Sequence, residues 1–324
     1  SQYRNQSTII RPYNNNSYSN NQRIYIPTRK KKKKTLSEKL QSAGSKLLKE
    51  TSEFLGNAKD KAVELTDNAV AKGNLPSFLM DSKKVPLEDA ASTVYNLSDK
   101  PTKLIVTGRL DEYTNYNFER LVEALRKDKV RVYLDLSNLK ISREFRETYG
   151  NINLKKCTGM IGIKLPDWVT SIGDSAFADC TNLAYIDIQP SVTSIGSGAF
   201  EFCSNLKEIT LPENLEVIQQ LALGYTGIET IELPQTLKTI GEAAFSSCKS
   251  LNYVNIHNGI TTIEARAFWD CDNLKAISIP DSVTLMRQEV FQGCENLEYV
   301  RLGSGFSTIS RGVCLFGNVA LWCI

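Results

Sequence analysis

Apolar residues recur at fixed positions throughout the C-terminal half of the chain. In each unit a leucine or isoleucine is followed, three and five positions later, by two aliphatic residues that alternate with polar ones. This alternation predicts a short strand with one face turned inward. A second aliphatic pair follows, and most units then contain an Ala-Phe pair. The first aliphatic column consists of Leu183, Leu206, Ile228, Leu251, Leu274 and Leu297.

A cysteine marks the same point in nearly every unit. Successive positions lie 23 residues apart, except for one interval of 22 residues. Self-similarity at such a period indicates a solenoid, and leucine-rich repeats have periods in this range. The column contains Cys157, Cys180, Cys203, Thr226, Cys248, Cys271 and Cys294.

Two stretches, "LPDWVTSIGDSAFADCTNL" and "IPDSVT", resemble the BspA-like, treponemal-type leucine-rich repeat, whose consensus has the form IP-x-x-VTSIG-x-x-AF-x-x-C-x-x-L. The resemblance covers about residues 157–310, in six units. The third unit departs from it, because Leu223 replaces the phenylalanine and Thr226 replaces the cysteine. The resemblance implies an α/β-type solenoid, a leucine-rich repeat array of 23-residue units.

The same resemblance implies a function. Proteins of this kind are typically bacterial adhesins, secreted or on the cell surface, that recognise host or neighbouring-cell proteins. A partner protein is therefore expected, from the host or the cell envelope, with no cofactor and no small-molecule substrate. The alternative is a structural protein of the envelope or of a filament, anchored through residues 1–72.

The N-terminal segments differ in composition from the repeats. Residues 1–34 are rich in Asn and Lys and contain nine Lys or Arg and no acidic residue, so we predict a disordered basic arm. Residues 35–72 carry apolar residues at helical spacing, which predicts an amphipathic helix. This helix is expected to dock on another chain, on a second copy in an oligomer or on a membrane surface. A helix without a partner is an equal alternative.

The next segments read as a linker and a cap. Residues 73–102 contain three prolines and are assigned to a linker. The patterns at 103–108, 115–129 and 130–138 predict strand, helix and strand, and thus a small α/β cap over residues 103–156. Residues 311–324 are predicted to form an apolar C-terminal cap of the solenoid, which we assign to residues 157–310.

Charge is distributed unevenly along the chain. Residues 1–34 have a net charge of +9, whereas residues 157–324 contain nine basic and 18 acidic residues, for a net charge of −9. The basic run is expected to contact an anionic surface or an acidic protein, including the acidic body of this chain. The alternative is a solvated charge run in a flexible tail. The run consists of Arg29, Lys30, Lys31, Lys32, Lys33 and Lys34.

The cysteine column is predicted to be structural. Equivalent residues of adjacent coils lie about 4.8 Å apart, within reach of a disulfide, but their side chains point in the same direction. A tetrahedral metal site needs convergent ligands, and the sequence has no CxxC and a single histidine, His257. Thr226 fits the column as a small side chain that bonds turn backbone. Cys314 and Cys323 lie outside the register, either paired with each other or free.

Alternate strand residues are predicted to point outward and to form the binding surface, as is usual for solenoids. Exposed tyrosine suits protein recognition, although tyrosine is also a good strand former. The candidate contact residues are Tyr185, Asp187, Glu208, Thr210, Glu232, Tyr253, Asn255, His257, Tyr299 and Arg301.

The sequence contains no pattern typical of an enzyme. It has no nucleotide-binding loop. With a single histidine, it offers no second histidine to choose from for a Ser/His/Asp arrangement. It also lacks a run of about 18 apolar residues. Because the chain begins with Ser1 rather than Met, we expect that a preceding segment was removed. The predicted location is the cell surface, the medium or the periplasm.

Overall fold

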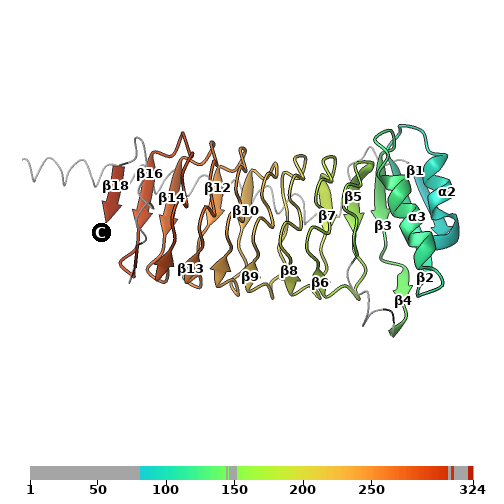
Figure 1. Ribbon diagram of the computed structural model, residues 1–324, viewed down its shortest axis with the longest axis horizontal. Helices are drawn as coiled ribbons and strands as arrows, with labels where there is room; N and C mark the ends of the chain where they lie inside the picture. The colour runs from blue at the N-terminus through green and yellow to red at the C-terminus, as the bar shows by residue number, and fades with distance from the viewer. Residues whose placement is uncertain (1–80, 144, 146–151, 306–307, 310–319, 324) are drawn as a thin grey trace, which may run out of the picture. The chain divides into compact units, whose positions relative to one another are not determined.

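The computed structural model describes residues 81–143, 145, 152–305, 308–309 and 320–323. These residues form an elongated stack of coils, with helices α2 (Leu87–Tyr95) and α3 (Asn115–Leu125) at one end (Figure 1). The predicted basic arm and the predicted amphipathic helix lie outside the described residues.

The helical end is a small parallel α/β unit. Phe118, Leu121 and Leu125 of α3 are buried, whereas Tyr116 is exposed, so the helix packs with one face only. The predicted strand, helix and strand correspond to β2, α3 and β3. The elements of the unit are β1 (Asp81–Pro86), α2, β2 (Thr102–Leu110), α3, β3 (Val132–Asp135) and β4 (Leu139–Ile141).

Residues 81–95, which the sequence assigns to a linker, form β1 and α2 instead. The prolines suggested a linker, but Pro86 lies at the N-cap of α2, where an N–H has no helical partner to lose. Leu87, Ala90 and Val94 of α2 are fully or almost fully buried. This apolar stripe packs α2 against α3. The packing stabilises a helix that is too short to be stable in isolation.

The cap and the solenoid share one parallel sheet. Its strand order is β1-β2-β3-β5-β7, so the cap strands continue directly into the first coils. Further coils add parallel strands in two smaller sheets, β10-β12 and β14-β16-β18. The solenoid strands are β5 (Met160–Lys164), β7 (Tyr185–Asp187), β10 (Thr230–Glu232), β12 (Tyr253–Asn255), β14 (Ala276–Ile279), β16 (Tyr299–Leu302) and β18 (Ala320–Cys323).

The second residue of the second aliphatic pair of each unit lies in a two-residue strand, and these strands form a second parallel sheet. The apolar pattern at these positions indicated burial but did not predict a strand. In β6 to β15 the second residue, such as Ile195 or Ile240, is buried in the core. The strands are β6 (Ser171–Ile172), β8 (Ser194–Ile195), β9 (Val217–Ile218), β11 (Thr239–Ile240), β13 (Thr262–Ile263), β15 (Leu285–Met286) and β17 (Thr308–Ile309).

Stacked phenylalanines fill the core between the coils. The ring centroids of Phe177 and Phe200 are 5.2 Å apart and their planes differ by 2°. Phe268 stacks in the same way between Phe245 and Phe291, at 5.3 and 5.8 Å. All five side chains are almost fully buried. Leu223 occupies the position between the two stacks and is also fully buried, so an aliphatic side chain can fill this column.

Two residues of each coil adopt the left-handed backbone conformation. One directly precedes the cysteine position and the other lies four residues earlier, with φ angles from 52° to 80°. Their N–H groups donate to the next coil, as from Ser175 to Ser197 and from Asp179 to Glu201, both at 2.8 Å. The residues are Ser175, Asp179, Gly198, Phe202, Leu221, Tyr225, Ala243, Ser247, Arg266, Asp270, Glu289 and Gly293.

The six cysteines of the column are buried and free, and those from Cys180 onward each bond to the preceding coil. The Cys203 thiol donates to the carbonyl oxygen of Phe177 at 3.1 Å, and Cys271 donates to Phe245 at 3.1 Å. Thr226 donates to the carbonyl oxygen of Leu223 at 2.8 Å. This confirms that a small side chain bonded to turn backbone fits the column. Cys314 lies outside the described residues, so both alternatives for Cys314 and Cys323, paired or free, stay open.

The stacked phenylalanines lead to a prediction for stability. Phe268→Ala should lower the free energy of unfolding by about 3–5 kcal/mol, because it leaves a cavity between two rings. Phe268→Leu should cost clearly less, since Leu223 shows that leucine fills this column. Urea unfolding followed by circular dichroism measures both values, and equal costs would contradict the role of the stack.

The buried thiols lead to a prediction for pH dependence. Burial raises the pKa of Cys248 to about 11, whereas an unfolded thiol has a pKa of about 8.5. The unfolded chain therefore loses this proton first, so the contribution to stability is complete below pH ~8.5 and is lost as the pH rises toward 11. Each such thiol should change the free energy of unfolding by up to about 1.4 kcal/mol per pH unit in this window.

Other groups titrate above pH 8.5 as well, so the measurement compares the wild type with Cys248→Thr. Threonine occupies this column at Thr226 and does not ionise, so the variant should fold and should lose less stability between about pH 8.5 and 11. Parallel slopes for the two proteins would show that the Cys248 thiol does not contribute.

Candidate protein-binding face

The outward side chains of the main parallel strands form one continuous surface, termed here the strand face. It runs from β2 and β3 of the cap through β5 and β7, residues 208–210 and β10 to β16. The pairing register places Lys103, Tyr133, Gly162 and Tyr185 in successive positions of one column. A partner can therefore contact cap and solenoid together.

The predicted contact residues differ in exposure along this face. Tyr185 is 37% exposed, and Asp187, Thr210 and Arg301 are also exposed. Glu208, Glu232, Asn255 and His257 are half-buried. Tyr253 and Tyr299, however, are each only 6% exposed, so the expectation that they face solvent is wrong.

The neighbours of the two buried tyrosines account for the difference. Tyr253 pairs with Thr230 on one adjacent strand, and Tyr299 pairs with Ala276. These short side chains leave room for the rings on the sheet surface, and they are themselves buried, at 9% and 7% exposure. Tyr185 pairs with Gly162 instead, and the space above Gly162 is taken by the ring of Tyr133. Burial also raises the pKa of Tyr253 to about 12. The readily accessible part of the strand face is thus its N-terminal half.

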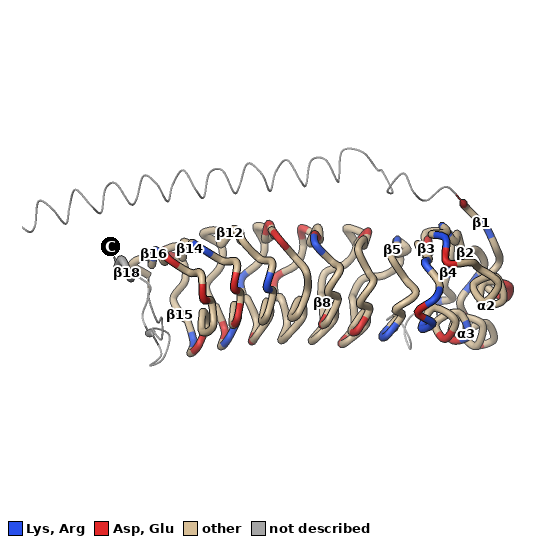
Figure 2. Tube along the Cα trace, turned by 90° about the horizontal axis from the view of Figure 1, so that it is seen from above, with Lys and Arg blue, Asp and Glu red and all other residues tan. Residues whose placement is uncertain are grey.

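Ion pairs cross this half from strand to strand. Lys103 of β2 lies 3.1 Å from Asp135 of β3, and Lys164 of β5 lies 3.2 Å from Asp187 of β7. Figure 2 shows basic and acidic residues interspersed along the coils rather than gathered in one patch of a single sign. The Lys164–Asp187 pair is exposed and contributes little to stability, whereas Asp135 of the other pair is buried. Together the pairs give the face a defined pattern of charge.

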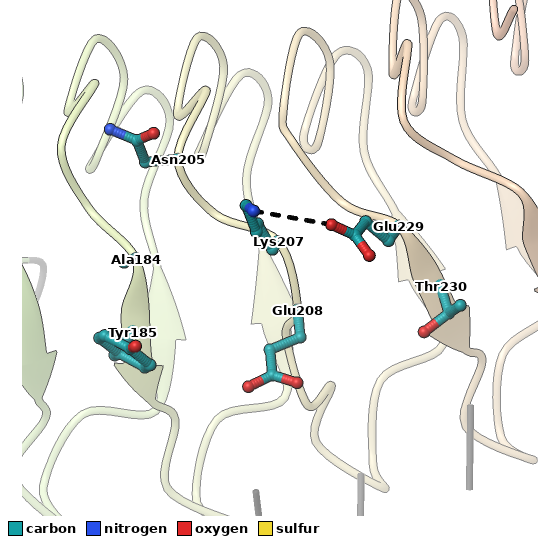
Figure 3. A pocket seen from close by; sticks show the side chains of 7 residues that line it. All are labelled: Ala184, Tyr185, Asn205, Lys207, Glu208, Glu229 and Thr230. Carbon is teal, nitrogen blue, oxygen red and sulfur yellow. Dashed lines mark ion pairs between the residues drawn. The ribbon is translucent and has the colours of Figure 1, made fainter. Parts of the chain in front are cut away.

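A shallow pocket of about 230 Å³ opens on the strand face beside Tyr185 (Figure 3). Lys207 and Glu229 form an ion pair of 3.8 Å on one side of it, and the carboxylate of Glu208 lies on the other side. Burial and the nearby charge of Glu229 raise the pKa of Glu208. The pocket is lined by Ala184, Tyr185, Asn205, Lys207, Glu208, Glu229 and Thr230.

Three side-chain atoms on or beside the strand face lack hydrogen-bond partners. The Nε2 atom of Gln189, the Oε1 atom of Glu232 and the hydroxyl of Tyr299 are each buried without such a partner in the described part of the chain. A buried polar atom without a partner carries a free-energy cost.

His257 is held by the backbone of its own and the preceding coil. Its Nε2 atom lies 2.8 Å from the carbonyl oxygen of Pro234, and its Nδ1 atom accepts from the N–H of Gly259 at 2.9 Å. The acceptor role of Nδ1 places the ring proton on Nε2, which donates to Pro234. Both nitrogens are therefore used within the fold.

Two residues of the strand face, Lys164 and Tyr133, do not occur among the predicted contacts. Lys164 lies one 23-residue period before Asp187, so extending the repeat columns back by one unit would have found it. Tyr133 belongs to the cap, which does not follow the 23-residue period of the repeats. Only the pairing register of the sheet places it beside Gly162. A Cβ at Gly162 would lie 2.5 Å from the Tyr133 ring, so glycine is needed for this close approach.

Other candidate chemistry is limited in the described part of the chain. Within it, no three His, Cys, Asp or Glu side chains group closely enough to hold a metal ion. None of its helices is long and apolar enough to span a membrane. The predicted anionic-partner contacts, Arg29 to Lys34, lie outside the described residues.

Comparison with protein families gives one match. The model of the BspA type leucine rich repeat region matches in six copies, over residues 133–234 and 222–321. The match includes the last strand of the cap as well as the repeats. No curated protein matches the chain.

Several solved structures are similar to part of the chain. A leucine-rich repeat protein from Bacteroides ovatus is 32% identical, with a TM-score of 0.44, over 48% of this chain and 43% of that one. The T. pallidum leucine-rich repeat protein is 31% identical, with a TM-score of 0.44, over 47% and 76%. A leucine-rich cell surface protein from Faecalibacterium prausnitzii is 22% identical, with a TM-score of 0.34, over 55% and 62%. The chain thus spans less than half of the B. ovatus protein.

Proposed function

The chain belongs to the family of BspA type leucine-rich repeat proteins, and on this basis we propose that it binds a partner protein through the N-terminal half of its strand face. The role is recognition without catalysis. The contact surface runs from Lys164 across Tyr185 and Asp187 to Glu208 and Glu232.

The exposed Tyr185 beside the pocket is the observation that carries this proposal. Tyrosine offers a large contact area and loses few rotamers on binding, which makes it a frequent hot-spot residue. Here it stands between a strand-to-strand ion pair, Lys164–Asp187, and the carboxylate of Glu208. A partner side chain that enters the pocket would meet an aromatic ring and hydrogen-bonding groups together.

The pocket specifies the partner's polar groups in part. The carboxylate of Glu208 lies on one side of it, and Lys207 and Glu229 lie on the other. The binding surface of the partner should therefore carry a hydrogen-bond donor opposite Glu208.

We further propose that the protein acts at the bacterial cell surface or after secretion, as an adhesin that recognises a host or neighbouring-cell protein. Membership of the family supports this location, because proteins of this kind are typically adhesins that are secreted or on the cell surface. A structural role in the envelope or on a filament is the second candidate. The run of basic residues from Arg29 to Lys34 favours it, since an anchor on an anionic component needs such charge.

A photo-cross-linking residue placed at Tyr185 in the full chain, in the source bacterium with host cells present, should capture one partner protein. The matched control is the same residue at Thr193, which is exposed but lies outside the strand face. Tyr185→Ala should then weaken binding of the captured protein at least about tenfold, as expected of a hot spot, whereas Thr193→Ala should not. Equal capture from positions 185 and 193 would refute the proposed face.

Protease added to intact cells should degrade the protein if it is displayed at the surface. Survival of the protein, together with co-purification with an envelope filament, would favour the structural role instead. Replacement of Arg29 to Lys34 by glutamine tests the anchor. The structural role requires that this variant leaves the filament fraction, and the adhesin role does not.

A further inference from the structure

An exposed aromatic pair lies on the edge of the solenoid, outside the strand face. The rings of Phe202 and Tyr225 stack with centroids 4.5 Å apart and planes inclined by 25°. Phe202 is 42% exposed, which makes it one of the few large apolar side chains exposed in the described part of the chain. The two residues occupy equivalent positions of adjacent coils, each directly before the cysteine column.

The backbone at this position does not favour large aromatic residues. Phe202 and Tyr225 have φ angles of 63° and 59°, in the left-handed region that bulky residues rarely adopt. Other coils place Asp179, Ser247 or Gly293 there, and aspartate and glycine adopt this conformation at low cost. Folding alone therefore gives no reason for two neighbouring aromatic side chains.

Two acidic residues are neighbours of Phe202 in the coil stack or in the sequence. Asp179 holds the equivalent position of the preceding coil, and its N–H donates to the carbonyl oxygen of Glu201, the residue before Phe202. Burial and the charge of Asp179 raise the pKa of Glu201, and Lys155 offsets part of this effect. Within the described residues neither carboxylate has an ion-pair partner. The Phe202 ring stacks on Tyr225 of the next coil.

We propose that Phe202 and Tyr225, together with Asp179 and Glu201, bind an arginine side chain of a partner protein. A guanidinium group stacks on aromatic rings and forms paired hydrogen bonds with a carboxylate. The site offers both, on an edge of a solenoid whose net charge is negative over residues 157–324. This site is separate from the strand face and does not depend on the function proposed for it.

The test measures binding of a hexa-arginine peptide to the full chain by calorimetry at physiological salt. Phe202→Leu keeps an apolar side chain but removes the ring, and it should weaken binding about tenfold, the size expected for a cation–π contact. Hexalysine should bind the wild type more weakly than hexa-arginine and should respond less to the variant, because ammonium does not stack. The matched control, Tyr113→Asn, removes an aromatic side chain that is 83% exposed in the cap and should change nothing.

A second variant separates binding from folding. Phe202→Asn introduces a residue that tolerates the left-handed conformation, so its midpoint of thermal unfolding should not fall, while arginine binding should be lost. Unchanged hexa-arginine binding in Phe202→Leu and Phe202→Asn would overturn the proposal. A tenfold gain in affinity after Lys30 to Lys34 are replaced by glutamine would also overturn it, because the chain's own basic run would then be the occupant.

Discussion

Each coil of the solenoid has to end one strand spacing above the point where it began, and this return constrains every residue column. Two left-handed residues per coil make the turns, and their N–H groups donate to the next coil. The buried cysteine that follows the second turn donates to a carbonyl of the preceding coil, as Cys294 does to Phe268 at 3.0 Å. Backbone groups in the turns are satisfied in this way without a helix, so the coil stays short and the sheet strands stay parallel.

The same return explains why the thiols are structural. Burial raises the pKa of Cys180 to about 12, and the charged thiolate that attacks electrophiles or binds metals is thereby disfavoured. The Phe177–Phe200 stack shows the second consequence, because identical side chains at one strand spacing pack face to face. Leu223 and Thr226 interrupt both columns in a single coil, and each keeps the size or the hydrogen bond that its column needs.

Since turns and core are tied to this geometry, side chains of different size and charge gather mainly on two surfaces. On the strand face the pleat alternates inward and outward side chains, so Tyr185 and Asp187 can change without loss of Ile186 as a core contact. On the edge the left-handed position tolerates few residues cheaply, so Phe202 and Tyr225 stand out against the aspartate, serine and glycine of other coils. The proposed edge site is thus recognised by its departure from the repeat rather than by the repeat itself.

The sequence alone determined the period, the buried columns, the parallel strands from Tyr185 onward except at residues 208–210, and the structural role of Thr226. Each of these depends on spacing that a repeat displays directly. The sequence did not reveal β1 and α2, since Pro86 indicated a break where it serves as a helix cap. It also did not reveal that Tyr253 and Tyr299 are buried while Tyr185 is exposed, or that Tyr133 joins the strand face. Those properties depend on which side chains lie on the adjacent strand, 23 or more residues away, and only the tertiary register decides that.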